Sequence, residues 1–567
     1  MRRLDWFYGS VLGLTLGCSA AGGGDSPPGP VGANGGSGGV AGGAGTAGTT
    51  GQVGPDPVQG PAGDPTALCG QSEAGSPGLR RLNRRELENT IRDVFPVVGG
   101  AWRSALSADT VSEAGFDNDT NMLLVSKQTA RELEETAESV GTAVAAGVAS
   151  VLPCAASNPS ASCAGQYLDS VGRRLFRRPL TQAERATYLG FFDTALTATG
   201  DFAQSISWLT RGLLESPSFV YRREVGTMAG ETTKLDQYEI ATELSYTFAG
   251  TGPSDALLDR AARAELSSTE ELVRTARELL LSPAGREVIQ TFFDAYVGHS
   301  RVTAIAKAGV QGFAQLREQM LEETRHFIEE VVVNRAGGVE ELLTANITTP
   351  TAALAAFYQF GTAPASDYAV LERPAGRGIG LLAQGSVLAT LAQPNGSSPT
   401  KRGMFVYERL LCNVVPQVPP NIPELKPPQP GERTTRQRYE EDHAQGSCQG
   451  CHSRWDPIGF GFEHFDEAGR YREQDGSLPI DTKSRVPQQG ETLFEFDGQE
   501  DLVTQLAAEP IVSQCLSGYV TTFAFGESLT CSGEGRRAEF MAGSLGIVDY
   551  LASLAAEPHF TERRLEP

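Results

Sequence analysis

The chain has 567 residues and carries 69 acidic against 47 basic side chains, which gives a formal net charge of −22. So acidic a surface repels phosphate backbones and argues against nucleic acid as a partner. After residue 20 no apolar run is long enough to span a bilayer; the nearest, Val140–Leu152, is short and rich in Ala and Gly. About 500 residues follow the N-terminal 66, too many for one core, so we expect roughly two to four domains.

Residues 1–18 have the layout of an export signal. A basic start is followed by the apolar stretch Trp6–Leu16 and by Cys18. This resembles a bacterial lipoprotein signal peptide, in which the cysteine becomes the lipidated first residue. Asp5 and the position of Leu14 depart from that pattern, and an ordinary secretory signal is the alternative. Either signal exports the chain, so we expect a periplasmic protein or an outer-membrane-attached lipoprotein that touches the membrane through lipid only.

Residues 19–66 consist mostly of Gly, Ala, Ser, Thr and Pro. Such a segment buries too little apolar surface to offset its own ordering entropy. It is predicted to be a disordered tether that holds the folded part away from a membrane surface.

Residues 67–230 and 231–370 are predicted to be two helical domains. Apolar residues recur at helical spacing, and Ser, Thr or Asp followed three residues later by Glu marks several helix starts. We assign these helices no chemistry. The acidic turn Phe116–Asp119 is a weak calcium candidate, for which a solvated turn is the better interpretation. Helices are expected at Leu79–Phe95, Thr181–Leu196, Asp236–Phe248, Ser268–Ser282 and Gln315–Val333.

Residues 371–430 are predicted to be a connecting segment, rich in Gly and small residues at first. It ends in Pro416–Pro430, where seven of fifteen residues are proline and an extended, stiff chain is expected. Residues 431–567 then form the last predicted domain, opening with a helix over Arg433–His452 and continuing with short strands and further helices.

Cys448-Gln449-Gly450-Cys451-His452 is the strongest motif of the chain. Two thiols spaced C-x-x-C and followed at once by histidine are typical of covalent haem c attachment. On one helical turn both sulfurs reach the porphyrin edge, and the imidazole of His452 becomes the proximal ligand of the iron. The alternatives are a zinc knuckle, which would need a second pair of ligands, and a structural disulfide between Cys448 and Cys451.

The far side of such an iron needs its own ligand or an open position. Aromatic residues between Trp455 and Phe465 would bury the porphyrin or simply form a core. The distal candidates are Met404, Met541, His464 and His443, without a choice among them. An isolated histidine in helical surroundings, such as His299 or His326, is expected to be structural.

The remaining cysteines suggest disulfides in an oxidising compartment. Setting Cys18, Cys448 and Cys451 aside leaves six of the nine. Short sequence separation favours Cys154 with Cys163 and Cys515 with Cys531, which leaves Cys69 with Cys412, one of fifteen possible pairings.

The segment CQGCHSRWDPIGFGFEHFDEAGRYR resembles exported multi-domain proteins of unknown function from planctomycetes and myxobacteria that carry a planctomycete-type cytochrome c domain. The Ser398–Gly403 stretch and the proline run fit the same family, and so do LNRRELENTIRDVF, GFDND, RRLFRRPLTQAER and LLESPSFVYRRE earlier in the chain. The resemblance covers about residues 78 to 560. It implies an exported, haem-associated protein and no particular substrate.

Taken together, we expect a mainly α, multi-domain protein with a small C-terminal cytochrome c-like module and a few short strands. The function predicted is that of an exported protein with one covalent haem c, which transfers electrons to or from an extracytoplasmic redox protein. The alternative is a haem-free surface scaffold that binds a cell-surface component, with Cys448–Cys451 as a disulfide. A haem peroxidase using His464 or Asp466 is a third option, although no catalytic constellation is defensible.

Overall fold

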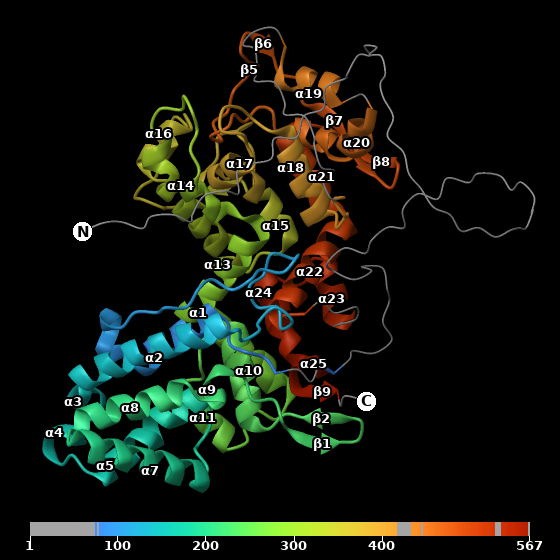
Figure 1. Ribbon diagram of the computed structural model, residues 1–567. Coiled ribbons are helices and arrows are strands. Elements are labelled where there is room, and N and C mark those ends of the chain that lie inside the picture. The colour runs from blue at the N-terminus through green and yellow to red at the C-terminus, as the bar shows by residue number, and fades with distance from the viewer. Residues whose placement is uncertain (1–73, 76–78, 417–432, 444–445, 528–533, 565–567) are drawn as a thin grey trace, which may run out of the picture.

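The computed structural model describes residues 74–75, 79–416, 433–443, 446–527 and 534–564. Helices make up most of it and its strands are short (Figure 1), so the prediction of a mainly α protein is confirmed. None of the described helices is long and apolar enough to cross a membrane. The predicted signal peptide and tether, residues 1–66, lie outside the described residues.

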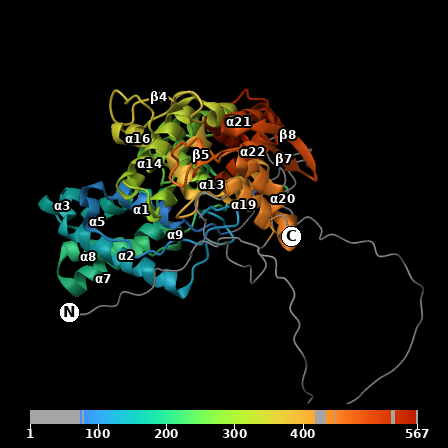
Figure 2. The ribbon, with the colours of Figure 1, turned by 90° about the horizontal axis from the view of Figure 1, so that it is seen from above.

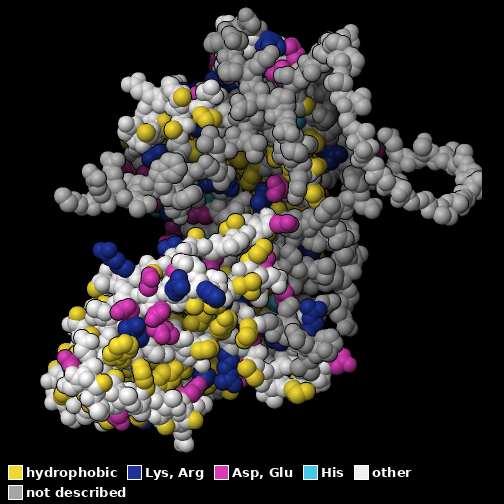
Figure 3. Space-filling model, in the orientation of Figure 1, with side chains coloured by type: hydrophobic (Ala, Val, Ile, Leu, Met, Phe, Trp, Pro, Cys, Tyr) yellow, Lys and Arg dark blue, Asp and Glu magenta, His cyan; other side chains and the backbone are white. Residues whose placement is uncertain are grey.

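The helices before residue 221 pack around a core of their own. Leu87 and Ile91 of the first helix meet Val140 of the second in it, and α2 and α8 lie side by side (Figures 1 and 2). The face in Figure 3 mixes acidic, basic and apolar side chains over this block. Its elements are α1 (Arg84–Val94), η1 (Pro96–Ala101), α2 (Lys127–Ala146), α3 (Val148–Val151), α4 (Cys154–Ser157), α5 (Ala161–Tyr167), η2 (Leu168–Gly172), α6 (Arg173–Phe176), α7 (Gln182–Thr199), α8 (Phe202–Leu214) and α9 (Pro217–Val220).

A second, larger core joins helices from residue 235 to residue 560. It first includes or borders α10 (Gln237–Ala249), α11 (Asp255–Ala262), α12 (Thr269–Leu281), α13 (Pro283–Val297), η3 (His299–Ala304), α14 (Phe313–Ile328), η4 (Glu329–Asn334), α15 (Val339–Thr344), α16 (Ala352–Phe357), η5 (Leu381–Ala383), α17 (Gly385–Thr390), α18 (Pro399–Phe405) and η6 (Val406–Leu410). After the proline run come α19 (Thr435–His443), α20 (Gly446–Phe460), α21 (Gly498–Ala508), α22 (Pro510–Phe525), α23 (Glu534–Met541), α24 (Ile547–Ser553), η7 (Leu554–Ala556) and α25 (Pro558–Thr561).

The strands form small antiparallel sheets. In the largest, Thr233 lies opposite Arg563, so the C-terminal strand is paired with a hairpin more than 300 residues earlier. A hairpin turns at Asp475-Gly476, with Gly476 at a positive φ of 65°. The sheets are β1 (Thr227–Ala229), β2 (Thr232–Lys234) and β9 (Glu562–Arg564); β3 (Ile347–Thr348) and β4 (Leu371–Glu372); β5 (Gln474–Asp475) and β6 (Leu478–Pro479); β7 (Lys483–Gln488) and β8 (Glu491–Asp497).

Several predicted helix starts are confirmed by their capping hydrogen bonds. Thr181 and Asp236 each open a helix with a complete capping box, and Ser268 caps the helix that ends before Ser282. The helix expected over Arg433–His452 corresponds to α19 and α20, and the two residues between them lie outside the described part of the chain. The expectation that the helix ends in the C-x-x-C-H motif is wrong, because α20 continues to Phe460 and carries the motif inside it.

Two predictions for the middle of the chain concerned non-ligand roles. The expected solvated turn at Phe116–Asp119 is instead partly buried, since Phe116 and Asn118 are 1% and 7% exposed and the Asn118 amide donates to the Phe523 carbonyl on α22. His299 is fully buried and its Nε2 lies 2.9 Å from Asp294, while the His326 ring stacks on Tyr368.

The first part of the predicted connecting segment is folded into the core. Gly403 on α18 lies so close to α20 that a Cβ there would come within 1.9 Å of the Trp455 carbonyl oxygen, and a Cβ on Gly459 would come equally close to that of Pro399. These glycines let two backbones touch. Small residues therefore bring α18 directly against the helix that carries the C-x-x-C-H motif.

One disulfide expectation agrees with the structure and two do not. Cys154 is bonded to Cys163. Cys412 is bonded to Cys515, with Cα atoms 5.5 Å apart across 103 positions, which makes the expected pairs Cys515–Cys531 and Cys69–Cys412 wrong. Short sequence separation is a poor guide to these pairs, because η6 and α22 pack against each other and bring two cysteines together that are distant in the sequence.

A buried network of charges joins α1, α10 and β9. Arg222 is 2% exposed and lies 2.5 Å from Glu86 and 3.2 Å from Glu243. Arg563 of β9 binds Glu224. Burial, followed by the nearby Glu243 carboxylate, raises the pKa of Glu224 to about 7. For Glu243, burial opposes ionisation but Arg222, Arg563 and Arg80 outweigh it, so its pKa is lowered. Below neutral pH, Glu224 is therefore protonated while Glu243 carries the negative charge.

The Gly403→Ala and Gly459→Ala substitutions should each lower the free energy of unfolding by about 1–3 kcal/mol or more, because the added methyl group forces α18 away from α20. Urea unfolding followed by circular dichroism measures this. Gly190→Ala in the open face of α7, where nothing lies within 4 Å of the added Cβ, is the control and should be neutral or stabilising. Equal effects at all three positions would contradict the close packing.

The Glu224→Gln substitution should flatten the dependence of stability on pH. Since the pKa of Glu224 is raised in the folded chain, the unfolded chain ionises first, and the free energy of unfolding falls as the pH rises from about 4.5 to about 7. We expect a loss of about 2–3 kcal/mol in the wild type over this window and little in Glu224→Gln. The exposed Glu231→Gln should behave as wild type in the same urea titrations; an identical slope in Glu224→Gln would refute the raised pKa.

Candidate functional site

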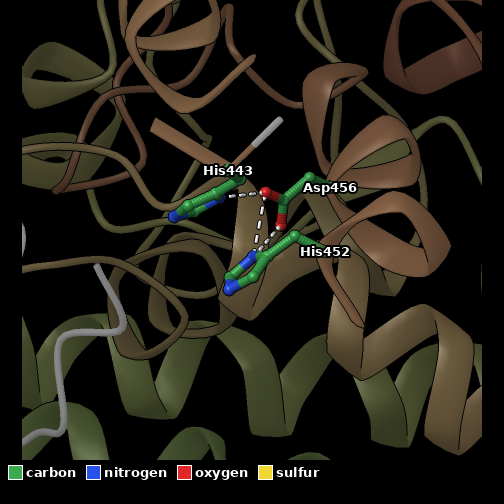
Figure 4. A group of neighbouring side chains, drawn as sticks. All are labelled: His443, His452 and Asp456. Atoms are coloured by element: carbon green, nitrogen blue, oxygen red, sulfur yellow. Dashed lines mark hydrogen bonds and ion pairs between the residues drawn. The ribbon is translucent and has the colours of Figure 1, made fainter. Parts of the chain in front are cut away.

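One face of α20 gathers the residues of the predicted haem site. Cys448, His452 and Asp456 follow one another at intervals of four, which places them along one side of the helix. His452 Nδ1 lies 3.0 and 3.2 Å from the two oxygens of Asp456. The carboxylate therefore fixes the orientation of the imidazole, and the ring presents its Nε2 away from Asp456 (Figure 4).

His443, from the end of α19, completes the cluster. Its Nδ1 lies 2.5 Å from Asp456 Oδ2, and its ring lies against that of His452 with centroids 3.6 Å apart and planes tilted by 30°. His443, His452 and Asp456 are 4%, 6% and 4% exposed. Two imidazoles from different helices thus share one buried carboxylate, as Figure 4 shows.

The electrostatic state of Asp456 explains this arrangement. Burial disfavours its charge, but hydrogen bonds from His443 and His452 outweigh burial and lower its pKa below the ordinary value. An ionised carboxylate only accepts hydrogen bonds, so each Nδ1 carries the proton that it donates. The Thr400 hydroxyl of α18 donates a further bond of 2.7 Å to the other oxygen. Within the described residues, no arginine or lysine forms an ion pair with Asp456.

Aromatic rings enclose the two imidazoles. Tyr439 meets His443 edge-on at 5.0 Å, and Trp455 meets His452 edge-on at 5.8 Å, with Tyr407 behind it. These side chains are buried in the large core or beside it. The aromatic residues that follow the motif therefore serve as core in this structure and also screen the site from water.

The two cysteines of the motif differ in state. Cys448 is disulfide-bonded, whereas Cys451 is a free, half-buried thiol, so the alternative of a Cys448–Cys451 disulfide is wrong. Cys18, Cys69 and Cys531 lie outside the described residues.

His452 is well suited to bind a haem iron, but the space around it is too small for a porphyrin. His452 offers a carboxylate-held imidazole with Nε2 directed away, which is the usual arrangement of a metal-binding histidine. Cys448 cannot form a thioether while its sulfur is bonded elsewhere. Two large hollows of about 580 and 460 Å³ border α20 at Phe460 and at Arg454, and neither is lined by His452. A macrocycle therefore fits only a reduced chain whose site has opened.

Two of the distal candidates, His443 and His464, have other contacts in the structure. His443 lies beside the ring of His452 rather than across an iron from it. His464 Nδ1 donates to the Arg472 carbonyl, and its ring stacks on Tyr471. Met404 on α18 packs against the large core. Met541 ends α23. The identity of a distal ligand thus stays a prediction.

Asp466, the other residue considered for peroxidase chemistry, has a structural role. Its carboxylate accepts bonds from the backbone of Ala468 and Arg470 and from the Arg470 side chain. The buried guanidinium of Arg402 holds the same turn through the carbonyls of Phe462 and Asp466. These bonds fix the path of the chain after α20.

Sequence reasoning missed the residue that organises the site. Asp456 stands four residues after His452, which is the spacing for contact on a helix, and this signal was available. The part played by Thr400 has no local signal, because it depends on α18 packing against α20.

Four family models match successive stretches of the chain, and each is described as a protein of unknown function. They are PSD3 (DUF1587) at residues 80–146, PSD5 (DUF1595) at 163–224, PSD4 (DUF1592) at 235–360 and PSCyt3 (DUF1588) at 377–475. The last contains Thr400, His443 and the whole C-x-x-C-H motif. No curated protein and no solved structure matches. The matches support a multi-domain protein of unknown function.

The Asp456→Asn substitution should lower the free energy of unfolding by about 2–4 kcal/mol, because it removes the charge that both imidazole donors face in a buried site. The lowered pKa of Asp456 stabilises the fold above the ordinary aspartate range and ceases to do so on acidification, so the difference between wild type and variant should shrink as the pH falls below about 3.8. Urea unfolding at several pH values measures both effects. Asp193→Asn on the exposed face of α7 is the control, expected within about 0.5 kcal/mol of wild type. A difference that grows on acidification would contradict an ionised Asp456.

Proposed function

We propose that this chain is an exported protein that binds one haem c through Cys448, Cys451 and His452 and exchanges single electrons with an extracytoplasmic redox protein. The observation that carries this proposal is the C-x-x-C-H motif on α20 with the Nδ1 of its histidine held by Asp456. The name of the family model that matches this stretch, PSCyt3, is in keeping with a cytochrome.

When bound, haem supplies a reversible one-electron couple, and the protein supplies binding, orientation and surroundings. Asp456 fixes the ring plane of His452 and makes its Nε2 a more basic ligand atom. Trp455 and Tyr439 exclude water beside the imidazoles, which favours the less charged state of any iron held there.

Loading requires the chain to be reduced first. Cys448 must release its disulfide before its sulfur can form a thioether, while Cys451 already has a free thiol. The crowded surroundings of His452, which is 6% exposed, must also open. We infer that haem is attached before the chain reaches the folded state described here.

Export is part of the proposal. A lipoprotein signal ending at Cys18 and the tether of residues 19–66 would attach the protein to the outer membrane or release it in the periplasm. The disulfides Cys154–Cys163 and Cys412–Cys515 suit an oxidising compartment. With a net charge of −22, a redox partner with a basic docking face is favoured.

Full-length protein made in a periplasm equipped for cytochrome c maturation should carry haem that survives denaturing electrophoresis. It should also show a low-spin absorption spectrum and a reversible one-electron titration. The double variant Cys448→Ala/Cys451→Ala should lose the pigment completely, because both attachment points are gone.

The matched control is Cys154→Ala/Cys163→Ala, which removes a disulfide outside the site and should keep the haem. His452→Ala should keep covalent pigment with an altered spectrum. An exported, folded wild-type chain without covalent haem would refute the proposal and leave the surface-scaffold function.

A further inference from the structure

The cluster at His443, His452 and Asp456 has the composition of a small-ion site, whether or not haem is present. We propose that these three side chains bind one divalent first-row transition metal ion in the haem-free chain. No thiol belongs to this site, and its ligands come from α19 and α20.

The three donor atoms already converge. Both Nδ1 atoms lie close to the same oxygen of Asp456, at 2.5 and 3.0 Å, and one ligand atom from each residue lies within 4.8 Å of the others. Around a zinc ion with bonds of about 2.0–2.1 Å, neighbouring ligand atoms are about 3.3 Å apart. Each Nδ1 therefore needs to move less than about 1 Å away from the Asp456 oxygen to make room for an ion, and its proton moves to Nε2 of the same ring.

The charge of the cluster favours a cation. Asp456 is 4% exposed, and within the part of the chain that the structure describes its ion-pair partners are His443 and His452. With two neutral imidazoles the cluster carries a buried net charge of −1. Buried charges are paired or coordinate metals. On ion binding each imidazole stays neutral by carrying its proton on Nε2 instead of Nδ1, and the divalent ion pairs the carboxylate charge directly.

The surroundings of the cluster resemble those of built metal sites. The Thr400 hydroxyl, 2.7 Å from the second oxygen of Asp456, fixes the carboxylate from outside. Tyr439 and Trp455 provide apolar walls beside the imidazoles. Three protein ligands leave a fourth position for water or a substrate.

The donor set selects the class of ion. Two imidazoles and one carboxylate suit Zn²⁺, Fe²⁺, Co²⁺, Ni²⁺ and Cu²⁺, whereas Ca²⁺ and Mg²⁺ prefer oxygen ligands. A single ion also needs no slot for a macrocycle, so it requires only the small separation of the side chains described above.

Metal-depleted full-length chain should bind one Zn²⁺ by isothermal titration calorimetry, with Co²⁺ giving visible absorption bands of a low-coordinate site. His443→Gln should weaken Zn²⁺ binding by at least about 100-fold, because it removes a direct ligand and not an outer-shell group. His464→Gln, which changes a histidine on another turn, should alter the affinity by less than about threefold.

Two further experiments distinguish metal binding at this site from haem attachment. Cys448→Ala/Cys451→Ala should bind Zn²⁺ as wild type does, and His443→Gln should still acquire covalent haem. X-ray absorption at the zinc edge of the unmodified chain should show nitrogen or oxygen at about 2.0–2.1 Å and no sulfur at about 2.3 Å, which tests the site even if a variant misfolds. Zn²⁺ affinity unchanged in His443→Gln, sulfur in the coordination shell, or no binding of Zn²⁺ or Co²⁺ would overturn the proposal.

Discussion

The carboxylate of Asp456 is the constraint on which the arrangement of the site depends. It is buried and ionised, so it must accept hydrogen bonds, and it takes them from two imidazoles and one hydroxyl. This fixes which nitrogen of His443 and of His452 faces inward. The direction of both rings, and therefore any chemistry at their other nitrogens, follows from one acidic side chain.

The position of Asp456 depends in turn on a contact between backbones. Gly403 and Gly459 let α18 and α20 touch, and this contact brings Thr400 to the carboxylate. Larger residues would hold the helices apart and leave the second oxygen of Asp456 without its donor. A stretch whose Gly-rich composition suggests a linker is therefore a structural support of the site.

Features that depend on residues close together in the sequence could be predicted correctly. Thr181 and Asp236 form their capping boxes because cap and partner are three residues apart. The C-x-x-C-H motif likewise lies on one helix. What could not be predicted depends on packing over long distances: the bond between Cys412 and Cys515, the place of His443 beside His452, and the engagement of Cys448 in a disulfide. Asp456 lies between these cases, since its spacing was visible and its burial was not.

The most direct test of this account is the protonation of the imidazoles, read by nitrogen-15 magnetic resonance of the metal-free, haem-free chain labelled at its six histidines. At neutral pH His443 and His452 should carry the proton on Nδ1, and both of their signals should change together in Asp456→Asn. Protons on Nε2 at His443 and His452, or spectra that are identical in wild type and variant, would contradict a shared, ionised carboxylate.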